Sequence, residues 1–225
     1  MLSLLKFITF GSVDDGKSTL IGRLLYDSKL LFTDQMQTLE LESKINSRSK
    51  GIDYSLLLDG LSAEREQGIT IDVAYRYFNT NKRSFIVADT PGHEQYTRNM
   101  AVGASYADLA IILVDATKGL LIQTRRHTRI CAMMGIKHVI LAVNKMDLVN
   151  YDQAVFYQIE NEFNDFIRSF EHVQAYIIPV CATMGINITD RSSVMSWYHD
   201  VSLLELLESI DVDDNSDDLS FVLPI

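Results

Sequence analysis

The sequence predicts an α/β fold of three layers, in which helices cover both faces of a mostly parallel six-stranded sheet with one antiparallel edge strand. Two patterns predict this fold. Short apolar runs alternate with longer amphipathic stretches along nearly the whole chain, which is typical of a parallel sheet packed between helices. Residues 71–78 instead alternate apolar and polar side chains and precede a polar turn at 79–82, which indicates an edge strand paired in a hairpin with the next run.

The other elements follow in chain order from the same patterns. Strands covered on both faces are apolar almost throughout, and such runs occur at residues 4–10, 84–88, 107–114, 139–143 and 175–180. Helices are predicted where apolar residues recur at intervals of three and four, at residues 18–26, 127–134, 153–170 and 203–210. Their apolar faces should place Met133, Met134, Phe163 and Phe166 in the core. The polar stretch 33–68 is longer than an inert connection and is interpreted as a functional loop.

Length and composition exclude several classes of protein. The 225 residues suit one globular domain that needs no disulfide or metal to fold, and its two cysteines are too few for a disulfide framework. A reducing, cytoplasmic setting is therefore expected. The N-terminal apolar residues lack the basic region of a signal peptide, and no apolar run reaches the roughly 18 residues of a membrane span.

Charge divides the chain into two parts. The net charge is −10, and residues 192–225 hold eight acidic and no basic side chains, which leaves 22 acids and 20 bases in residues 1–191. Such a nearly neutral body does not predict a nucleic-acid surface, which needs a basic face. We expect a first domain over residues 1–212. The acidic stretch 213–218 resembles a linker, and the apolar residues 221–223 resemble a strand whose partner is not in this chain.

A phosphate-binding motif joins the first predicted strand to the first predicted helix. Gly11-Ser12-Val13-Asp14-Asp15-Gly16-Lys17-Ser18 matches the pattern G-x-x-x-x-G-K-[ST]. In such a loop, backbone N–H groups and a helix N-terminus surround the phosphates of a nucleotide. Lys17 should bridge the β- and γ-phosphates, and the Ser18 hydroxyl should coordinate Mg²⁺. The motif therefore specifies the α/β fold further, as that of a P-loop nucleoside triphosphatase.

Two further segments complete the predicted phosphate and metal site. Asp89-Thr90-Pro91-Gly92 ends a predicted strand at the carboxyl edge of the sheet, so that Asp89 should hold Mg²⁺ through water and the Gly92 amide should contact the γ-phosphate. His93 follows and is the candidate for orienting the attacking water. Thr70 precedes the edge strand, where its hydroxyl and carbonyl could reach Mg²⁺ and the γ-phosphate. The catalytic candidates are thus Lys17, Thr70 and His93, and the metal candidates are Ser18, Thr70 and Asp89.

A base-recognition motif ends another strand at the same edge. Within Asn144-Lys145-Met146-Asp147, the Asp147 carboxylate can accept hydrogen bonds from N1–H and the 2-amino group of guanine, whereas adenine has no amine there. Asn144 and Lys145 should connect this segment to the phosphate loop and stack on the base. In Cys181-Ala182-Thr183, the Ala182 amide could donate to guanine O6, and the Cys181 sulfur is interpreted as buried and structural. The predicted ligands are therefore GTP or GDP with Mg²⁺.

These motifs resemble those of GTPases of the translation-factor superfamily over about residues 4–212. Within that superfamily the chain most resembles the GTPase subunits of bacterial two-subunit sulfate adenylyltransferases. The narrower resemblance rests on residues 11–20, which include Thr19, and on residues 59–78, 89–100 and 123–127. At 199–201 the chain departs from it, because His-Asp-Val stands where that family usually shows Gly-Pro.

The resemblance implies a function and a partner. It implies a GTP-binding domain followed by β-barrel domains, with residues 213–225 as the acidic linker and the start of the first barrel. It also implies a heterodimer with the catalytic small subunit. In that complex, GTP hydrolysis would be coupled to the synthesis of adenosine 5′-phosphosulfate and pyrophosphate from ATP and sulfate, in sulfate assimilation.

Two other interpretations remain open. A translation elongation factor that carries aminoacyl-tRNA would share the motifs, but such factors usually have Thr-Arg-Glu-His where this chain has Thr-Arg-Arg-His at 124–127. A small-molecule kinase would share the phosphate loop but has no need of the motif at 144–147. Both interpretations are therefore less favoured than the sulfate enzyme.

Overall fold

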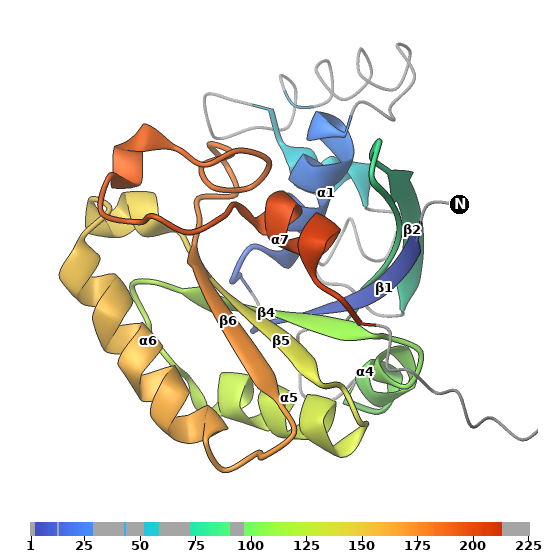
Figure 1. Cartoon of the computed structure of the whole chain (residues 1–225). Coiled ribbons are helices and arrows are strands. Elements are labelled where there is room, and N and C mark those ends of the chain that lie inside the picture. The colour runs from blue at the N-terminus through green and yellow to red at the C-terminus, as the bar shows by residue number, and fades with distance from the viewer. Residues whose placement is uncertain are drawn as a thin grey trace, which may run out of the picture.

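The computed structural model describes residues 3–12, 14–28, 43, 52–58, 73–90 and 97–212. Within these residues, six strands form one sheet with helices around it (Figure 1). The strands are β1 (Ser3–Phe10), β2 (Ala74–Asn79), β3 (Arg83–Asp89), β4 (Leu109–Asp115), β5 (His138–Asn144) and β6 (Gln174–Pro179). The predicted three-layer α/β fold is thereby confirmed.

The topology of the sheet places several candidate residues at one edge. The strand order is β2-β3-β1-β4-β5-β6, and neighbours are parallel except for the antiparallel pair β2 and β3, so the predicted antiparallel edge strand is confirmed. Every residue of β4 is buried, as expected for a central strand covered on both faces. Parallel pairing sets Thr9 opposite Asp89 and Asp115 opposite Asn144. The carboxyl ends of β1, β3, β4 and β5 therefore meet.

Helices follow the strands in the order that right-handed crossovers require. They are α1 (Lys17–Asp27), α4 (Thr97–Ala104), α5 (Ile122–Met133), α6 (Gln153–Ile167) and α7 (Leu203–Ser209), with the short 3-10 helices η1 (Tyr54–Leu57), η3 (Met146–Val149) and η4 (Ser193–Met195). The chain moves along the sheet in one direction from β1 to β3 and in the other from β4 to β6, so α1 packs on the face opposite to α5 and α6. No helix among the described residues has the length and apolar run that a bilayer crossing requires.

The structure differs from the predicted helices in two places and corrects the predicted burial of two methionines. The sequence did not predict α4, and α5 begins at Ile122, five residues before the predicted start at 127. Its buried face consists of Thr124, His127, Thr128 and Cys131, which is too polar to be recognised from an apolar period. Met133 is 83% exposed and Met134 is also exposed, so placing them in the core was wrong, because they lie outside that face. Phe163 is buried and Phe166 packs against the core, as predicted.

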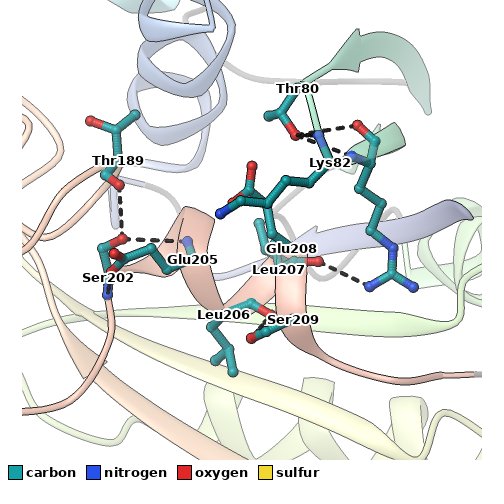
Figure 2. A network of polar contacts seen from close by, with 10 residues as sticks. Thr80, Lys82, Thr189, Ser202, Glu205, Leu206, Leu207, Glu208 and Ser209 are labelled. Carbon is teal, nitrogen blue, oxygen red and sulfur yellow. Dashed lines mark hydrogen bonds and ion pairs between the residues drawn. The ribbon is translucent and has the colours of Figure 1, made fainter. Parts of the chain in front are cut away.

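The last helix is tied to the β2–β3 hairpin. Arg83, which begins β3 and is only 4% exposed, donates hydrogen bonds to the carbonyl oxygens of Leu207 (3.1 Å) and Ile210 (2.5 Å) at the end of α7. Beside it, the exposed Lys82 pairs with Glu208 at 2.7 Å (Figure 2). A helix leaves its last carbonyl groups without helical partners, and a nearby cation stabilises them. The hairpin therefore fixes the C-terminal end of α7.

Replacing Arg83 with methionine is expected to lower the free energy of unfolding by about 2–4 kcal/mol, because two buried hydrogen bonds from a charged donor are lost. Lys82→Met is the matched control, since it removes a neighbouring cation that is itself 70% exposed to solvent. Chemical denaturation of both variants measures the difference. If the two variants have the same unfolding midpoint, the contacts of Arg83 do not hold α7.

Candidate nucleotide-binding site

The phosphate loop lies between the end of β1 and the first turn of α1. Gly16 is the N-cap of the helix, with a left-handed φ of 93°, and as a glycine it offers no side chain to cap the first turn. Among the described residues, the N–H groups of the first turn therefore have no capping side chain, as a phosphate-binding helix terminus requires. Gly16 also has a steric role, because a Cβ at this position would lie 2.5 Å from the Asn144 amide nitrogen.

Lys17 is held inside the loop by backbone oxygens. Its Nζ donates hydrogen bonds to the carbonyls of Gly11 (2.9 Å) and Ser12 (3.0 Å). Burial lowers the pKa of Lys17, and the negative charges of Asp89, Asp15 and Asp14 oppose this shift. The Lys17 ammonium group is thus buried in the loop and attracted by Asp89. This placement is consistent with the predicted role of Lys17 as a cation beside the nucleotide phosphates.

Asp15 shapes the loop from within. Its carboxylate accepts a hydrogen bond of 2.6 Å from the Ser12 amide, and the residue is almost fully buried. Burial raises the pKa of Asp15, while the Ser12 amide and the Lys17 charge lower it, and the burial effect prevails. The Asp15 side chain is buried inside the protein, so Asp15 contributes to the predicted binding loop by fixing the conformation of the loop backbone.

Asn144 joins the phosphate loop to the base-recognition segments. Its side-chain nitrogen donates to the Asp15 carbonyl at 2.9 Å, and its side-chain oxygen accepts from the Ala182 amide at 3.0 Å. The predicted connection between Asn144 and the phosphate loop is present. The Ala182 amide donates to Asn144 because the two segments lie side by side, and its predicted hydrogen bond to guanine O6 stays a prediction. One amide group therefore sets the spacing between the phosphate and base ends of the site.

Lys145 is positioned by a residue that the sequence did not single out. Its Nζ pairs with Asp115 Oδ2 at 2.8 Å, and the backbone N–H and hydroxyl of Thr117 donate to Asp115 Oδ1. Burial alone would raise the pKa of Asp115, but the hydrogen bonds from Lys145 and Thr117 hold it below its ordinary value. The sequence shows only that β4 ends in an acidic residue at the same edge of the sheet as the other motifs. The pairing of Asp115 with Lys145 follows from the register between β4 and β5.

Asp147 and Cys181 lie together at the predicted base end of the site. The Cys181 thiol donates to Asp147 Oδ1 at 3.1 Å and lies 3.3 Å from the hydroxyl of Thr183. Burial raises the pKa of the Cys181 thiol, so it remains a neutral S–H donor near pH 7. This agrees with the interpretation of Cys181 as a buried structural cysteine, which here orients the carboxylate of Asp147.

The metal candidates are described in part. Ser18 lies in the first turn of α1, and Asp89 is buried at the end of β3. A hydroxyl and a carboxylate are hard oxygen donors of the kind that Mg²⁺ accepts, so the donor set fits the ion. Val13, Thr70, Gly92 and His93 lie outside the described residues, and their roles stay predictions.

His127 supports this site from behind the phosphate loop. It is 2% exposed, and its ring lies 5.8 Å from that of Phe10 at the end of β1. Burial, together with the charges of Lys17 and Arg126, lowers the pKa of His127 from 6.5 to about 4. The imidazole is therefore neutral near pH 7 and does not add a second cation beside Lys17.

The lowered pKa of His127 predicts an acid-sensitive fold. The His127 side chain binds a proton more tightly in the unfolded chain than in the folded chain. The contribution of neutral His127 to the free energy of unfolding is therefore complete above about pH 6.5 and is lost as the pH falls toward 4. Between pH 7 and pH 5 the wild-type protein should lose about 2 kcal/mol more than His127→Phe, which keeps a ring against Phe10. Urea denaturation at both pH values measures this, and parallel losses in the two proteins would contradict the assignment.

The fold and the site define a class of protein. A phosphate loop between β1 and α1, acids at the ends of β3 and β4, and a guanine-recognition motif after β5 make this a P-loop domain for guanine nucleotides. The chain belongs to the elongation factor Tu GTP-binding domain family, whose model matches residues 2–212.

Individual relatives narrow the comparison. The chain is 57% identical over 210 residues to sulfate adenylyltransferase subunit 1 of Colwellia psychrerythraea, covering 93% of this chain and 45% of that protein. It is 57% identical over 224 residues to the bifunctional enzyme NodQ of Rhizobium sp. (strain N33), covering 99% of this chain and 35% of that protein. The chain thus spans about half or less of the length of these relatives.

A solved structure agrees in fold. The Ski7 GTPase-like domain of S. cerevisiae, bound to GDP and inorganic phosphate, matches with a TM-score of 0.78 at 22% sequence identity, over 92% of this chain and 49% of that one. At this identity the likeness shows the fold alone.

Proposed function

We propose that this chain is the GTP-binding and GTP-hydrolysing domain of a sulfate adenylyltransferase subunit. The structural observation that supports nucleotide binding is the pair of hydrogen bonds made by the Asn144 side chain. They join the phosphate loop at Asp15 to the predicted base segment at Ala182. This junction builds one site from three distant segments, as binding of a whole nucleotide requires. Identity of 57% to a sulfate adenylyltransferase subunit 1 supports this interpretation over an elongation factor.

The residues of the site would divide the chemistry as follows. Lys17 would exchange its bonds to the Gly11 and Ser12 carbonyls for the β- and γ-phosphates. Ser18, Asp89 and Thr70 would hold Mg²⁺, which neutralises charge on the phosphates when bound. His93 would orient the attacking water, and the Gly92 amide would contact the γ-phosphate. Lys145 would lie against the base that Asp147 recognises, held there by Asp115.

The partner would be the catalytic small subunit in a cytoplasmic heterodimer. That subunit would form adenosine 5′-phosphosulfate and pyrophosphate from ATP and sulfate, for sulfate assimilation. The formation of this mixed anhydride is strongly uphill, and GTP hydrolysis on the present domain would help to drive it. Residues 213–225 would link the domain to a following β-barrel domain.

A turnover assay tests this proposal. Because no arginine in the described part of the chain is evidently placed to stabilise the transition state, GTP hydrolysis by the subunit alone should be slow. Mixing the full-length subunit with the catalytic subunit should raise GTP turnover at least about tenfold, and only when both ATP and sulfate are present. Equal turnover without sulfate would contradict the coupling, and fast single-turnover hydrolysis by the isolated chain would contradict dependence on a partner.

A further inference from the structure

A groove lies beside the outer edge of the sheet, away from the nucleotide site. It has a volume of about 590 Å³, within the range of ligand-binding clefts. Strand β6 forms its floor through residues 175–178, and Glu160 and Asn164 of α6 form one wall. Residues 198–201 and Leu206 of α7 form the other wall. In Figure 1, β6 is the outermost strand on the side of α6.

The floor of the groove presents an open strand edge. The amides of Gln174 and Val180 donate to the carbonyls of Lys137, just before β5, and Val143, in β5, at 2.7 and 2.8 Å. Because directions alternate along a strand, the backbone groups of Ala175 and Ile177 point the other way, into the groove. Within the described residues, β6 pairs with no strand on that side. At its far end the edge is closed, because Pro179 has no N–H and its carbonyl accepts from Asn187 at 3.0 Å.

The walls give this edge a negative charge. Glu160 and Asp200 face each other across the groove, and none of its described lining residues is a lysine or arginine. Burial and then the charge of Asp200 raise the pKa of Glu160. Burial also raises the pKa of Tyr198, helped by the charges of Asp200, Glu160 and Glu205. The segment that supplies Asp200 is the one that departs from the resembled family at 199–201.

Charge selects the occupant of the groove. Residues 213–218 of this chain carry four aspartates, which the two carboxylates would repel. A second copy is also disfavoured, since each chain has a net charge of −10. An extended segment with a basic side chain matches both features, because its backbone can pair with Ala175 and Ile177 and its cation can lie between the acids.

We propose that the groove beside β6 is a docking site for an extended basic segment of a partner protein. The segment adds as a short strand to the free edge and places a lysine or arginine between Glu160 and Asp200. Main-chain hydrogen bonds supply binding and the acid pair supplies selectivity, which is the division of roles in β-strand addition. The site lies on another side of the domain from the phosphate loop and does not depend on the proposed enzymatic activity.

A labelled peptide tests the proposal. The probe is fluorescein-labelled Thr-Val-Arg-Val-Arg-Val-Thr, titrated with the chain at about 100 mM salt to screen distant charges. One comparison peptide has glutamate in place of both arginines, and another carries an N-methyl group on the central valine. The protein variants are Glu160→Gln, Asp200→Asn and the control Asp165→Asn, which removes a charge from an exposed site on the same helix.

The results separate docking from general attraction to an acidic protein. We expect Glu160→Gln and Asp200→Asn each to weaken binding about tenfold and Asp165→Asn to change it less than about twofold. N-methylation should weaken binding as strongly, and the peptide should slow hydrogen exchange at Ile177. Equal effects of all three variants, binding of the glutamate peptide, or no binding would overturn the proposal. Self-association that depends on Glu160 would assign the groove to a second copy and overturn it too.

Discussion

Asp147→Asn is expected to lower the affinity for GTP by about 10³-fold and to give the protein a preference for xanthosine triphosphate. The Asp147 carboxylate is predicted to accept two donors of guanine, whereas an asparagine amide would present its own N–H groups to one of them. Xanthine carries an oxygen where guanine carries the 2-amino group, so the amide can donate to it. The Cys181 thiol, 3.1 Å from Asp147 Oδ1, can still donate to the amide oxygen, so the side chain should keep its orientation.

Calorimetric titration of wild-type and D147N protein with GTP, xanthosine triphosphate and ATP measures the change. Asp165→Asn is the matched control, because the same charge is removed from an exposed helical position. The control should bind GTP as the wild type does. Unchanged GTP preference in D147N, or equal binding of ATP by the wild type, would remove Asp147 from base recognition.

Asn144→Ala should impair both stability and binding. The side chain is 3% exposed and satisfies the Asp15 carbonyl and the Ala182 amide at once. Leaving each of these buried groups without a partner costs about 1–3 kcal/mol, so the free energy of unfolding should fall by about 2–5 kcal/mol. Because the phosphate and base segments are no longer joined, GTP affinity should fall by about 10²-fold or more.

Denaturation without nucleotide and GTP titration measure the two effects separately. Asn161→Ala deletes the same atoms from an exposed position of α6 and should leave both quantities nearly unchanged. A stability loss with unchanged GTP affinity would show that Asn144 holds the sheet edge together but does not set the geometry of the site.

The sequence predicts the sheet well because most of its strands are buried on both faces and are therefore apolar in unbroken runs. It predicts the site through short motifs that keep their spacing along the chain. Helix α4 escaped prediction because Thr97–Ala104 is only eight residues long and contains Gly103, a poor helix former. The start of α5 was not predicted because the buried face of this helix is mostly polar.

The contacts that assemble the site could not be predicted in the same way. Asn144 meets Asp15 across 129 residues of sequence and Ala182 across 38. Lys145 meets Asp115 because β4 and β5 pair in a register that sets Asp115 opposite Asn144. Local sequence patterns contain neither distance nor register. The contacts of Lys145 with Asp115 and of the Ala182 amide with Asn144 are therefore found only when the strands are placed side by side.

Strand β3 has a different task at each of its ends. Its last residue is Asp89, the candidate magnesium ligand. Its first residue is Arg83, which donates hydrogen bonds to carbonyl oxygens at the end of α7. At about 3.3 Å per residue, roughly 20 Å separate these two points. The direction in which the chain leaves Ile210 is therefore set by the strand that also carries the candidate magnesium ligand.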